Sequence, residues 1–138
     1  MLTTMMQKLL ALVIVLLLPV PALAGTITLK LLCQYLNYVD KEGVHRVKGD
    51  FRLTFIIDDK GSAYMLGKRG SIQVQVGGQR ERLTFIDLTP DGHVRTATEV
   101  YDTGYSLHSQ NAVIAGEWVT IRVYDGYCVV AFRRQAPE

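Results

Sequence analysis

The chain has 138 residues, of which 49% are hydrophobic and 20% carry a charge, and its formal net charge is +2. Because 15 basic side chains nearly balance 13 acidic ones, the composition does not indicate nucleic acid or an anionic membrane as a partner. The length is typical of a single domain that buries one core, and it leaves little room for a second domain.

The first 24 residues have the pattern of a secretory signal peptide. Lys8 precedes an unbroken apolar run over residues 9–18, prolines follow, and Ala22-Leu23-Ala24 is a small-x-small cleavage motif. The apolar run is shorter than the roughly 20 residues of a spanning helix, and Gly25 stands where a lipoprotein has cysteine. We therefore expect an exported domain of residues 25–138, periplasmic or secreted, with no membrane association after cleavage.

Almost every apolar segment after residue 25 alternates with a period of two, which is the pattern of a half-buried strand. Helical spacing is not convincing anywhere in this part of the chain. In chain order, the predicted inward faces are Ile27/Leu29/Leu31/Cys33, Phe51/Leu53/Phe55/Ile57, Ile72/Val74/Val76, Leu83/Phe85, Val119/Ile121/Val123 and Cys128/Val130/Phe132. The large rings among them, Phe51, Phe55, Phe85 and Phe132, are expected to fill the interior.

Turn signals containing glycine or aspartate separate these segments. They are Asp59–Gly61, Gly67–Gly70, Gly77–Gly78, Pro90–Gly92, Asp102–Gly104, Ala115–Gly116 and Asp125–Gly126. Seven turns imply about eight strands, and their spacing is typical of an antiparallel sandwich or barrel. One longer polar stretch, residues 40–49, breaks this rhythm and is expected to be a mobile loop.

Cys33 lies on the apolar face of the first predicted strand, and Cys128 lies on that of the last one. An exported chain meets an oxidising compartment, so we expect these two cysteines to form a disulfide. Closing so long a loop should stabilise the fold by about 4 to 5 kcal/mol in the loop-entropy account. If the two strands also pair, the sheet closes and loses its edges. We therefore predict an all-β fold, a small antiparallel up-and-down barrel of about eight strands, with a β-sandwich as the alternative.

Residues of catalytic or metal-binding type are present, but their spacing does not indicate a site. His45, His93 and His108 lack the spacing of zinc ligands and are expected on the surface. Ser106 and Ser109 flank His108, without the context of a nucleophile elbow. We therefore expect no enzymatic activity, no cofactor and no metal site.

Tyrosine is the most informative residue type for binding. All seven tyrosines lie after residue 25, and a tyrosine combines a rigid apolar face with a hydroxyl that suits interfaces. The basic turn Lys68-Arg69 is a second candidate, and hairpin pairing is expected to bring Arg80 and Arg82 near it. The candidate binding surface consists of Tyr101, Tyr105, Trp118, Tyr124, Tyr127, Lys68 and Arg69.

In size, export, predicted barrel and disulfide, the chain resembles the small periplasmic inhibitors of c-type lysozyme. Members of that family place a Ser-Gly-x-x-Tyr loop and a Thr-Lys-Gly loop in the lysozyme cleft. The nearest segments here are Gly61-Ser62-Ala63-Tyr64 and Gly67-Lys68-Arg69-Gly70, and neither matches those motifs. The resemblance is therefore one of architecture and not of motif.

The sequence favours an exported interaction module that binds or inhibits another periplasmic protein through loops on a rigid barrel. One alternative is a lipocalin-like carrier of a small apolar ligand, and another is an enzyme of unfamiliar type. The two binding functions differ in the interior of the barrel. Large inward side chains favour a filled core and hence the interaction module, whereas an enclosed apolar pocket of several hundred cubic ångströms would favour the carrier.

Overall fold

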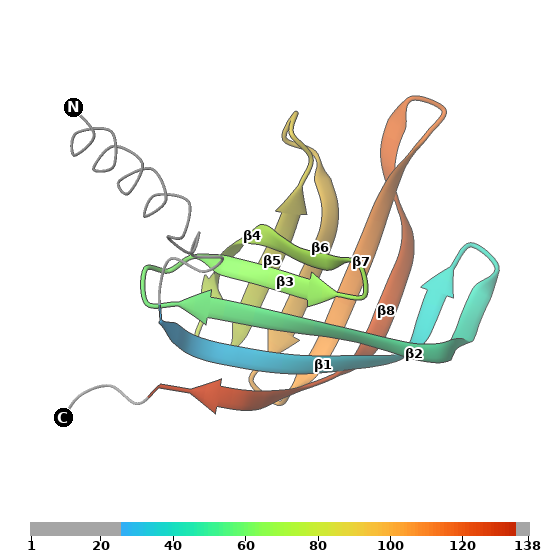
Figure 1. Cartoon of the computed structure of the whole chain (residues 1–138). Helices are drawn as coiled ribbons and strands as arrows, with labels where there is room; N and C mark the ends of the chain where they lie inside the picture. The colour runs from blue at the N-terminus through green and yellow to red at the C-terminus, as the bar shows by residue number, and fades with distance from the viewer. Residues whose placement is uncertain (1–25, 135–138) are drawn as a thin grey trace, which may run out of the picture.

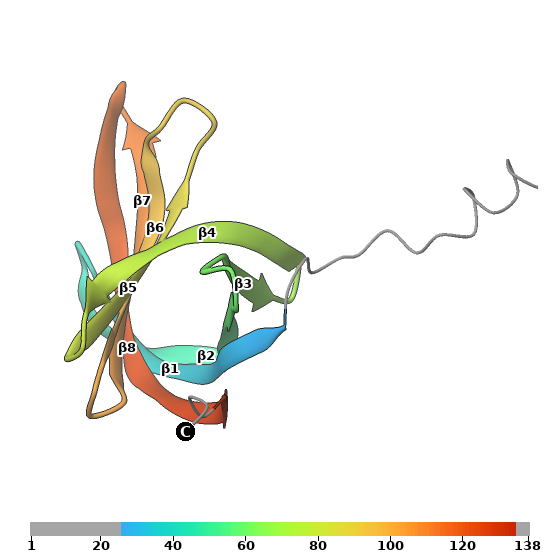
Figure 2. The ribbon, with the colours of Figure 1, turned by 90° about the vertical axis from the view of Figure 1, so that its left-hand side faces the viewer.

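The computed structural model describes residues 26–134, which form a closed barrel of antiparallel strands joined in chain order (Figures 1 and 2). The strands are β1 (Ile27–Asp40), β2 (Gly43–Asp58), β3 (Ala63–Gly67), β4 (Gly70–Gln79), β5 (Arg82–Leu88), β6 (Val94–Tyr101), β7 (Tyr105–Ile114) and β8 (Glu117–Arg133). The predicted eight-stranded up-and-down barrel is confirmed, and the sandwich alternative does not apply. The predicted signal peptide, residues 1–24, lies outside the described residues.

Alternation along the strands fills the barrel with side chains. On β1, Leu31, Cys33 and Tyr35 are buried, and the residues between them are exposed. Phe55 of β2 and Phe85 of β5 stack across the interior with their ring centroids 4.4 Å apart, and each is only 1% exposed. Burying a phenylalanine side chain contributes about 1.5 to 3 kcal/mol through removal of apolar surface from water. The buried core consists of Leu31, Cys33, Tyr35, Leu53, Phe55, Ala63, Val74, Phe85, Val100, Tyr124 and Cys128.

The prediction that Phe132 helps to fill the interior is wrong, because its side chain is 47% exposed. The pairing of β8 with β1 shifts register near the end of the sheet, where Leu31 pairs with Val130 but Lys30 pairs with Phe132. An extra residue in one strand disrupts the inward and outward alternation beyond it. The last residues of β8 therefore do not extend the core.

Five of the predicted turns connect strands, but the other two lie inside strands. Gly77 and Gly78 belong to β4, which turns into β5 only after Gln79. Gly78 has a φ of +116°, and a Cβ atom there would lie 2.2 Å from the backbone oxygen of Arg82. The glycine therefore allows the strand to bend just before the turn.

The Asp125–Gly126 pair is the second turn prediction that is wrong, because both residues lie in the middle of β8. A Cβ atom at Gly126 would lie 1.9 Å from the backbone oxygen of Gln34. Glycine is needed here because β8 approaches the backbone of β1 too closely for any side chain. As a result, the segments predicted as two strands form one long strand that crosses the whole barrel.

Residues 40–49 are not a loop, because they form most of the hairpin that joins β1 to β2. Asp40 pairs with Gly43 across a two-residue turn. Farther along, Asn37 pairs with Arg46 and Tyr35 pairs with Phe51, so residues 47–50 of β2 stand opposite the single residue Leu36. This bulged segment contains Gly49, whose φ of +83° suits glycine.

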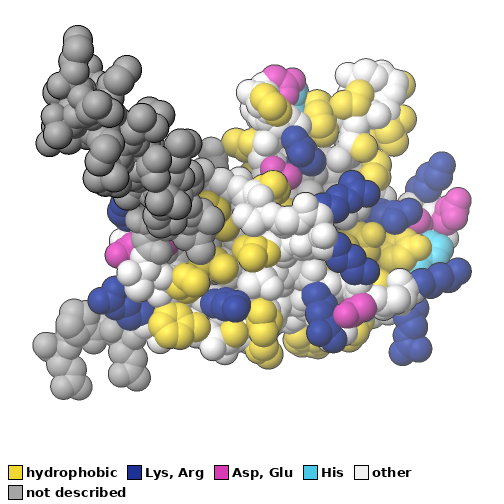
Figure 3. Space-filling view, in the orientation of Figure 1, with side chains coloured by type: hydrophobic (Ala, Val, Ile, Leu, Met, Phe, Trp, Pro, Cys, Tyr) yellow, Lys and Arg dark blue, Asp and Glu magenta, His cyan; other side chains and the backbone are white. Residues whose placement is uncertain are grey.

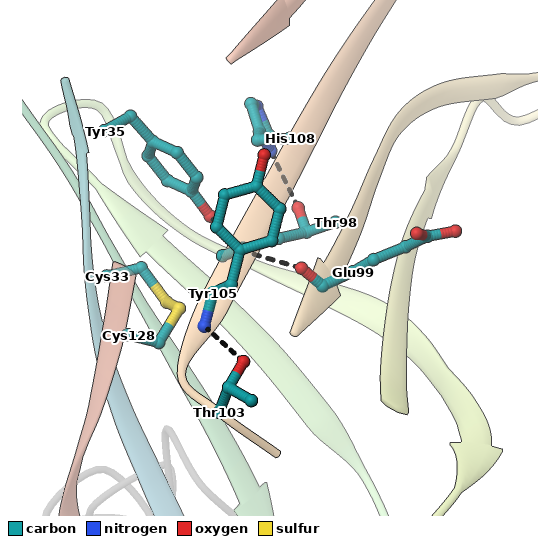
Figure 4. The surroundings of a disulfide bond; sticks show 9 residues. Cys33, Tyr35, Thr98, Glu99, Thr103, Tyr105, His108 and Cys128 are labelled. Carbon is teal, nitrogen blue, oxygen red and sulfur yellow. Dashed lines mark hydrogen bonds between the residues drawn. A yellow bond between two sulfur atoms is a disulfide. The ribbon is translucent and has the colours of Figure 1, made fainter. Parts of the chain in front are cut away.

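The predicted disulfide is confirmed, and it lies where the barrel closes. Cys33 and Cys128 are direct partners in the pairing of β1 with β8, and their sulfur atoms are bonded (Figure 4). A disulfide in such a position is typical of proteins that fold in an oxidising compartment. Within residues 26–134 there is no helix with the length and hydropathy that crossing a membrane requires.

Candidate functional site

Toward one end of the barrel the interior changes from apolar to polar. The hydroxyl of Tyr35 donates to the hydroxyl oxygen of Ser106, 2.9 Å away, and Ser106 in turn donates to the backbone oxygen of Glu99 at 2.8 Å. Beside them, the hydroxyl of Thr98 lies 2.7 Å from Nδ1 of His108, as the dashed line in Figure 4 shows. Thr98 and Ser106 have no exposed surface. These hydrogen bonds offset the cost of burying polar groups.

The prediction that all three histidines lie on the surface is wrong for His108, which is only 2% exposed. Ser106 and His108 occupy the inward face of β7, while the more hydrophobic Tyr105 and Leu107 face the other way. The apolar alternation that marks the inner face elsewhere is therefore inverted on this strand. Burial lowers the pKa of His108 to about 4, so its imidazole is neutral at pH 7.

Aromatic rings connect this polar layer to the open end of the barrel. The ring centroid of Phe51 lies 5.6 Å from that of His108 and 4.6 Å from that of Tyr124. Tyr38 follows, with its centroid 5.4 Å from Tyr124. Burial raises the pKa of the Tyr35 phenol, which adjoins Phe51, to about 12, although its hydrogen bond with Ser106 acts in the opposite direction.

A recess of about 430 Å³ opens above these rings. It forms where the bulged segment of β2, residues 47–50, meets the β3–β4 turn and β8. Figure 3 shows Lys and Arg side chains around an apolar patch on this side of the molecule. The residues that line the recess are Tyr38, Val47, Lys48, Asp50, Phe51, Arg52, Leu53, Lys68, Arg122 and Tyr124.

The recess is basic, since four of its lining side chains are cationic and only Asp50 is anionic. Arg52 pairs with Asp50, with a nitrogen–oxygen distance of 3.0 Å. Lys48, Lys68 and Arg122 form no ion pair within the described part of the chain. The near-balance of charge over the whole chain therefore hides a local excess of positive charge.

The structure places the residues of the predicted binding surface in several locations. Lys68 and Tyr124 line the recess, and Arg69 is next to Lys68 in the exposed β3–β4 turn. Lys68 and Arg80 lie at opposite ends of β4, which has 10 residues and spans about 33 Å at the usual rise of a strand. The expected closeness of these basic residues is therefore wrong, because β4 is a full-length strand and not a short hairpin arm.

The other aromatic residues of the predicted surface lie away from the recess. Tyr101, Tyr105 and Tyr127 form a cluster in which neighbouring ring centroids are 6.0 Å apart. Trp118 stacks on His93 with the centroids 5.2 Å apart. Trp118 belongs to the β7–β8 hairpin and His93 to the β5–β6 hairpin, and both hairpins project beyond the barrel (Figure 1). A single surface made of all seven predicted residues therefore does not exist, although a binding role for each group stays a prediction.

Sequence reasoning missed Tyr38, Lys48, Arg52 and Arg122 as site residues. Three of them lie on β1 and β2 on either side of the hairpin turn, and Arg122 comes from β8, far away in the sequence. The signal that was available is the polar stretch 40–49, which departs from the turn pattern of the rest of the chain.

A group of ligand-type side chains lies at the β1–β2 turn, next to the recess. Ligand atoms of Asp40, Glu42 and His45 lie within 4.8 Å of one another. Asp40 accepts hydrogen bonds from the backbone N–H of Glu42 at 2.8 Å and from His45 Nε2 at 2.9 Å. The bond from Glu42 holds the pKa of Asp40 below its usual value. These contacts are those of a capped hairpin turn, and they account for the arrangement without an ion.

Comparison of the chain with models of protein families, with curated proteins and with solved structures finds no match. The chemistry of the basic recess and of the aromatic rings beneath it is therefore the basis for inferring a function.

Proposed function

We propose that the chain is an exported, non-catalytic interaction module that binds an acidic segment of another exported protein in the basic recess. The observation that carries this proposal is the recess itself, in which four cationic side chains and one carboxylate surround aromatic rings. Positive charge concentrated in a concave site attracts an acidic partner and speeds its approach. Aromatic side chains beneath the charges provide the apolar contact area that binding sites need.

The rigidity of the barrel supports this role. The recess is lined by residues whose neighbours are fixed in the core, since Phe51 and Tyr124 pack on His108. The disulfide between β1 and β8 also constrains two of the strands that form the recess. A site that is ordered before binding loses less conformational entropy when the partner arrives.

The filled interior favours this proposal over a carrier of the lipocalin type. A carrier needs a hollow barrel, but rings such as Phe55 and Phe85 stack across the interior of this one. The burial of the polar groups favours it over an enzyme as well. His108 and Tyr35 are almost completely buried, and both make hydrogen bonds with hydroxyl groups of the barrel wall, so neither side chain is open to a substrate.

The proposal is tested by comparing three forms of the protein, each purified after expression of the full chain and immobilised. They are the wild type, the recess variant K48Q/K68Q, and the control K30Q/K60Q, which removes the same charge away from the recess. Proteins captured from an envelope extract are identified, and each partner is then purified and titrated. We expect a partner whose affinity falls about tenfold or more with the recess variant and falls with added salt, while the control binds like the wild type. Equal affinities for all three forms would contradict the proposal.

A further inference from the structure

Arg122 differs from the other cations of the recess in how it is held. Its guanidinium carbon lies 5.0 Å from the centroid of the Tyr38 ring, and its Nη1 donates to the Tyr124 hydroxyl at 3.4 Å. The hydrogen bond to Tyr124 also raises the pKa of Arg122 above its usual value. A guanidinium positioned by two aromatic side chains is oriented before any partner arrives.

Among residues 26–134 the Arg122 guanidinium has no carboxylate partner, and it stands at the wall of the recess. Arg52, in contrast, already pairs with Asp50 at 3.0 Å. A free guanidinium is matched by a planar anion that accepts two parallel hydrogen bonds. Asp50 lines the recess and Asp40 acts electrostatically on Arg122, so part of the positive charge around Arg122 is already offset, and the single charge of a carboxylate is enough to pair with it.

The surroundings of Arg122 also define what should accompany the anion. Phe51 and Val47 line the same recess and pack against the core. These side chains offer apolar contact beside the cation, which suits an anionic group attached to an apolar one. A fully hydrated polyanion would leave this apolar lining uncovered.

We infer that Arg122 receives a carboxylate of the partner in a bidentate pair, while an adjoining apolar group of the partner lies against Phe51 and Val47. This inference rests on the proposed function and specifies the chemistry of what is bound. The carboxylate has two sources in a protein, an acidic side chain and the chain terminus. Tyr38 is a positioning residue, because it acts through Arg122.

The test is a titration of the isotopically labelled protein followed by NMR. The probes are N-acetylphenylalanine and its amide, which share a ring and differ only in the carboxylate. We expect N-acetylphenylalanine to produce saturable shifts near Phe51 and Tyr124 at millimolar concentrations, and the amide to bind about tenfold more weakly or worse. The absence of saturable shifts with the acid, or equal binding of the amide, would overturn the inference.

Variants of Arg122 and Tyr38 test whether Arg122 is the residue that pairs with the carboxylate. R122Q should weaken binding of N-acetylphenylalanine at least tenfold, and R122K, which keeps the charge but loses the planar fork, should weaken it several-fold. R133Q removes an exposed arginine from the far end of β8 and should bind like the wild type, while thermal unfolding confirms that every variant is folded. Y38F should bind like the wild type, and Y38L should bind more weakly because Arg122 loses its ring. Wild-type affinity in R122Q would overturn the inference.

Two peptides, both acetylated at the N-terminus, distinguish an acidic side chain from a chain terminus as the source of the carboxylate. One carries a phenylalanine next to a glutamate and has an amidated end, and the other ends in a phenylalanine with a free carboxyl group. Tighter binding of the first indicates an acidic side chain, tighter binding of the second indicates a chain terminus, and loss of either with R122Q supports the inference. If K48Q/K68Q weakens the captured partner but R122Q does not, the proposed function holds and the role of Arg122 falls; if neither variant weakens it, both fall.

Discussion

The two halves of the barrel interior are built on different principles. In one half, Phe55, Phe85, Ala63 and Val74 fill the space without a polar group among them. In the other, Tyr35 and its hydroxyl-bearing and imidazole neighbours need a specific partner for each polar atom. Apolar packing tolerates hydrophobic substitutions of similar volume, whereas each buried hydrogen bond requires its particular partner. We infer that the first half supplies most of the stability and that the second half holds the rings under the recess in place.

Removal of the disulfide should have the largest effect on stability. With both Cys33 and Cys128 replaced by alanine, we expect the free energy of unfolding to fall by about 4 to 5 kcal/mol, because the crosslink no longer restricts the unfolded chain. Urea unfolding of the variant and of the wild type measures the difference. A loss of less than about 1 kcal/mol would mean that strand pairing alone closes the barrel.

Truncation in the apolar half should come next. Phe55→Ala leaves Phe85 without its stacking partner, and we expect a loss of about 3 to 5 kcal/mol. Leu32→Ala is a suitable control because Leu32 is exposed, and it should cost less than about 1 kcal/mol. Affinity for N-acetylphenylalanine should stay unchanged in the folded fraction of Phe55→Ala; a loss of affinity there would contradict the separation of the two halves.

The polar half should make stability depend on pH through His108. Its pKa is about 4 in the fold and about 6.5 in an unfolded chain. The unfolded state therefore binds the proton more readily, and the free energy of unfolding should fall as the pH drops from about 6.5 to about 4, by on the order of 3 kcal/mol. Urea unfolding at several pH values, compared with His108→Gln, isolates this contribution from that of the carboxylates. The same pH dependence in both proteins would show that His108 is not buried as a neutral ring.

Removing positive charges from the recess should have the smallest effect on stability. Lys48 and Lys68 are exposed and lie in no ion pair of the described chain. We expect K48Q/K68Q to change the free energy of unfolding by less than about 0.5 kcal/mol, even though it removes two charges from the recess. Thermal unfolding at low and high salt measures this. A large loss of stability would mean that these lysines support the fold rather than a partner.

The alternation of β1 and β2 predicts their inward faces correctly, but that of β7 misleads. Leu31, Cys33 and Phe55 are hydrophobic and lie inside as expected. On β7 the inward residues are Ser106 and His108, because their polar atoms find partners on neighbouring strands. A pattern of hydrophobicity along one strand contains no information on hydrogen-bond partners from another strand.

Glycine marks a turn at some positions of this chain and a close approach of two strands at others. Gly61, Gly92 and Gly104 lie in turns between strands, but Gly126 allows β8 to pass close to the backbone of β1. Both uses depend on the missing side chain. Only the path of the second strand distinguishes them, and that path is a property of the folded barrel.

Local signals in the sequence are enough to predict an antiparallel fold of about eight strands joined by a disulfide, with a barrel preferred over a sandwich. Period-two alternation, turn residues and two cysteines on the first and last strands are local signals, and few topologies satisfy them all. The position of the basic recess, in contrast, depends on the tertiary structure. The basic recess brings together β1, β2, the β3–β4 turn and β8, and its rim depends on a bulge opposite Leu36. Strand register places charges from distant segments side by side, and the order of residues along the chain does not specify that register.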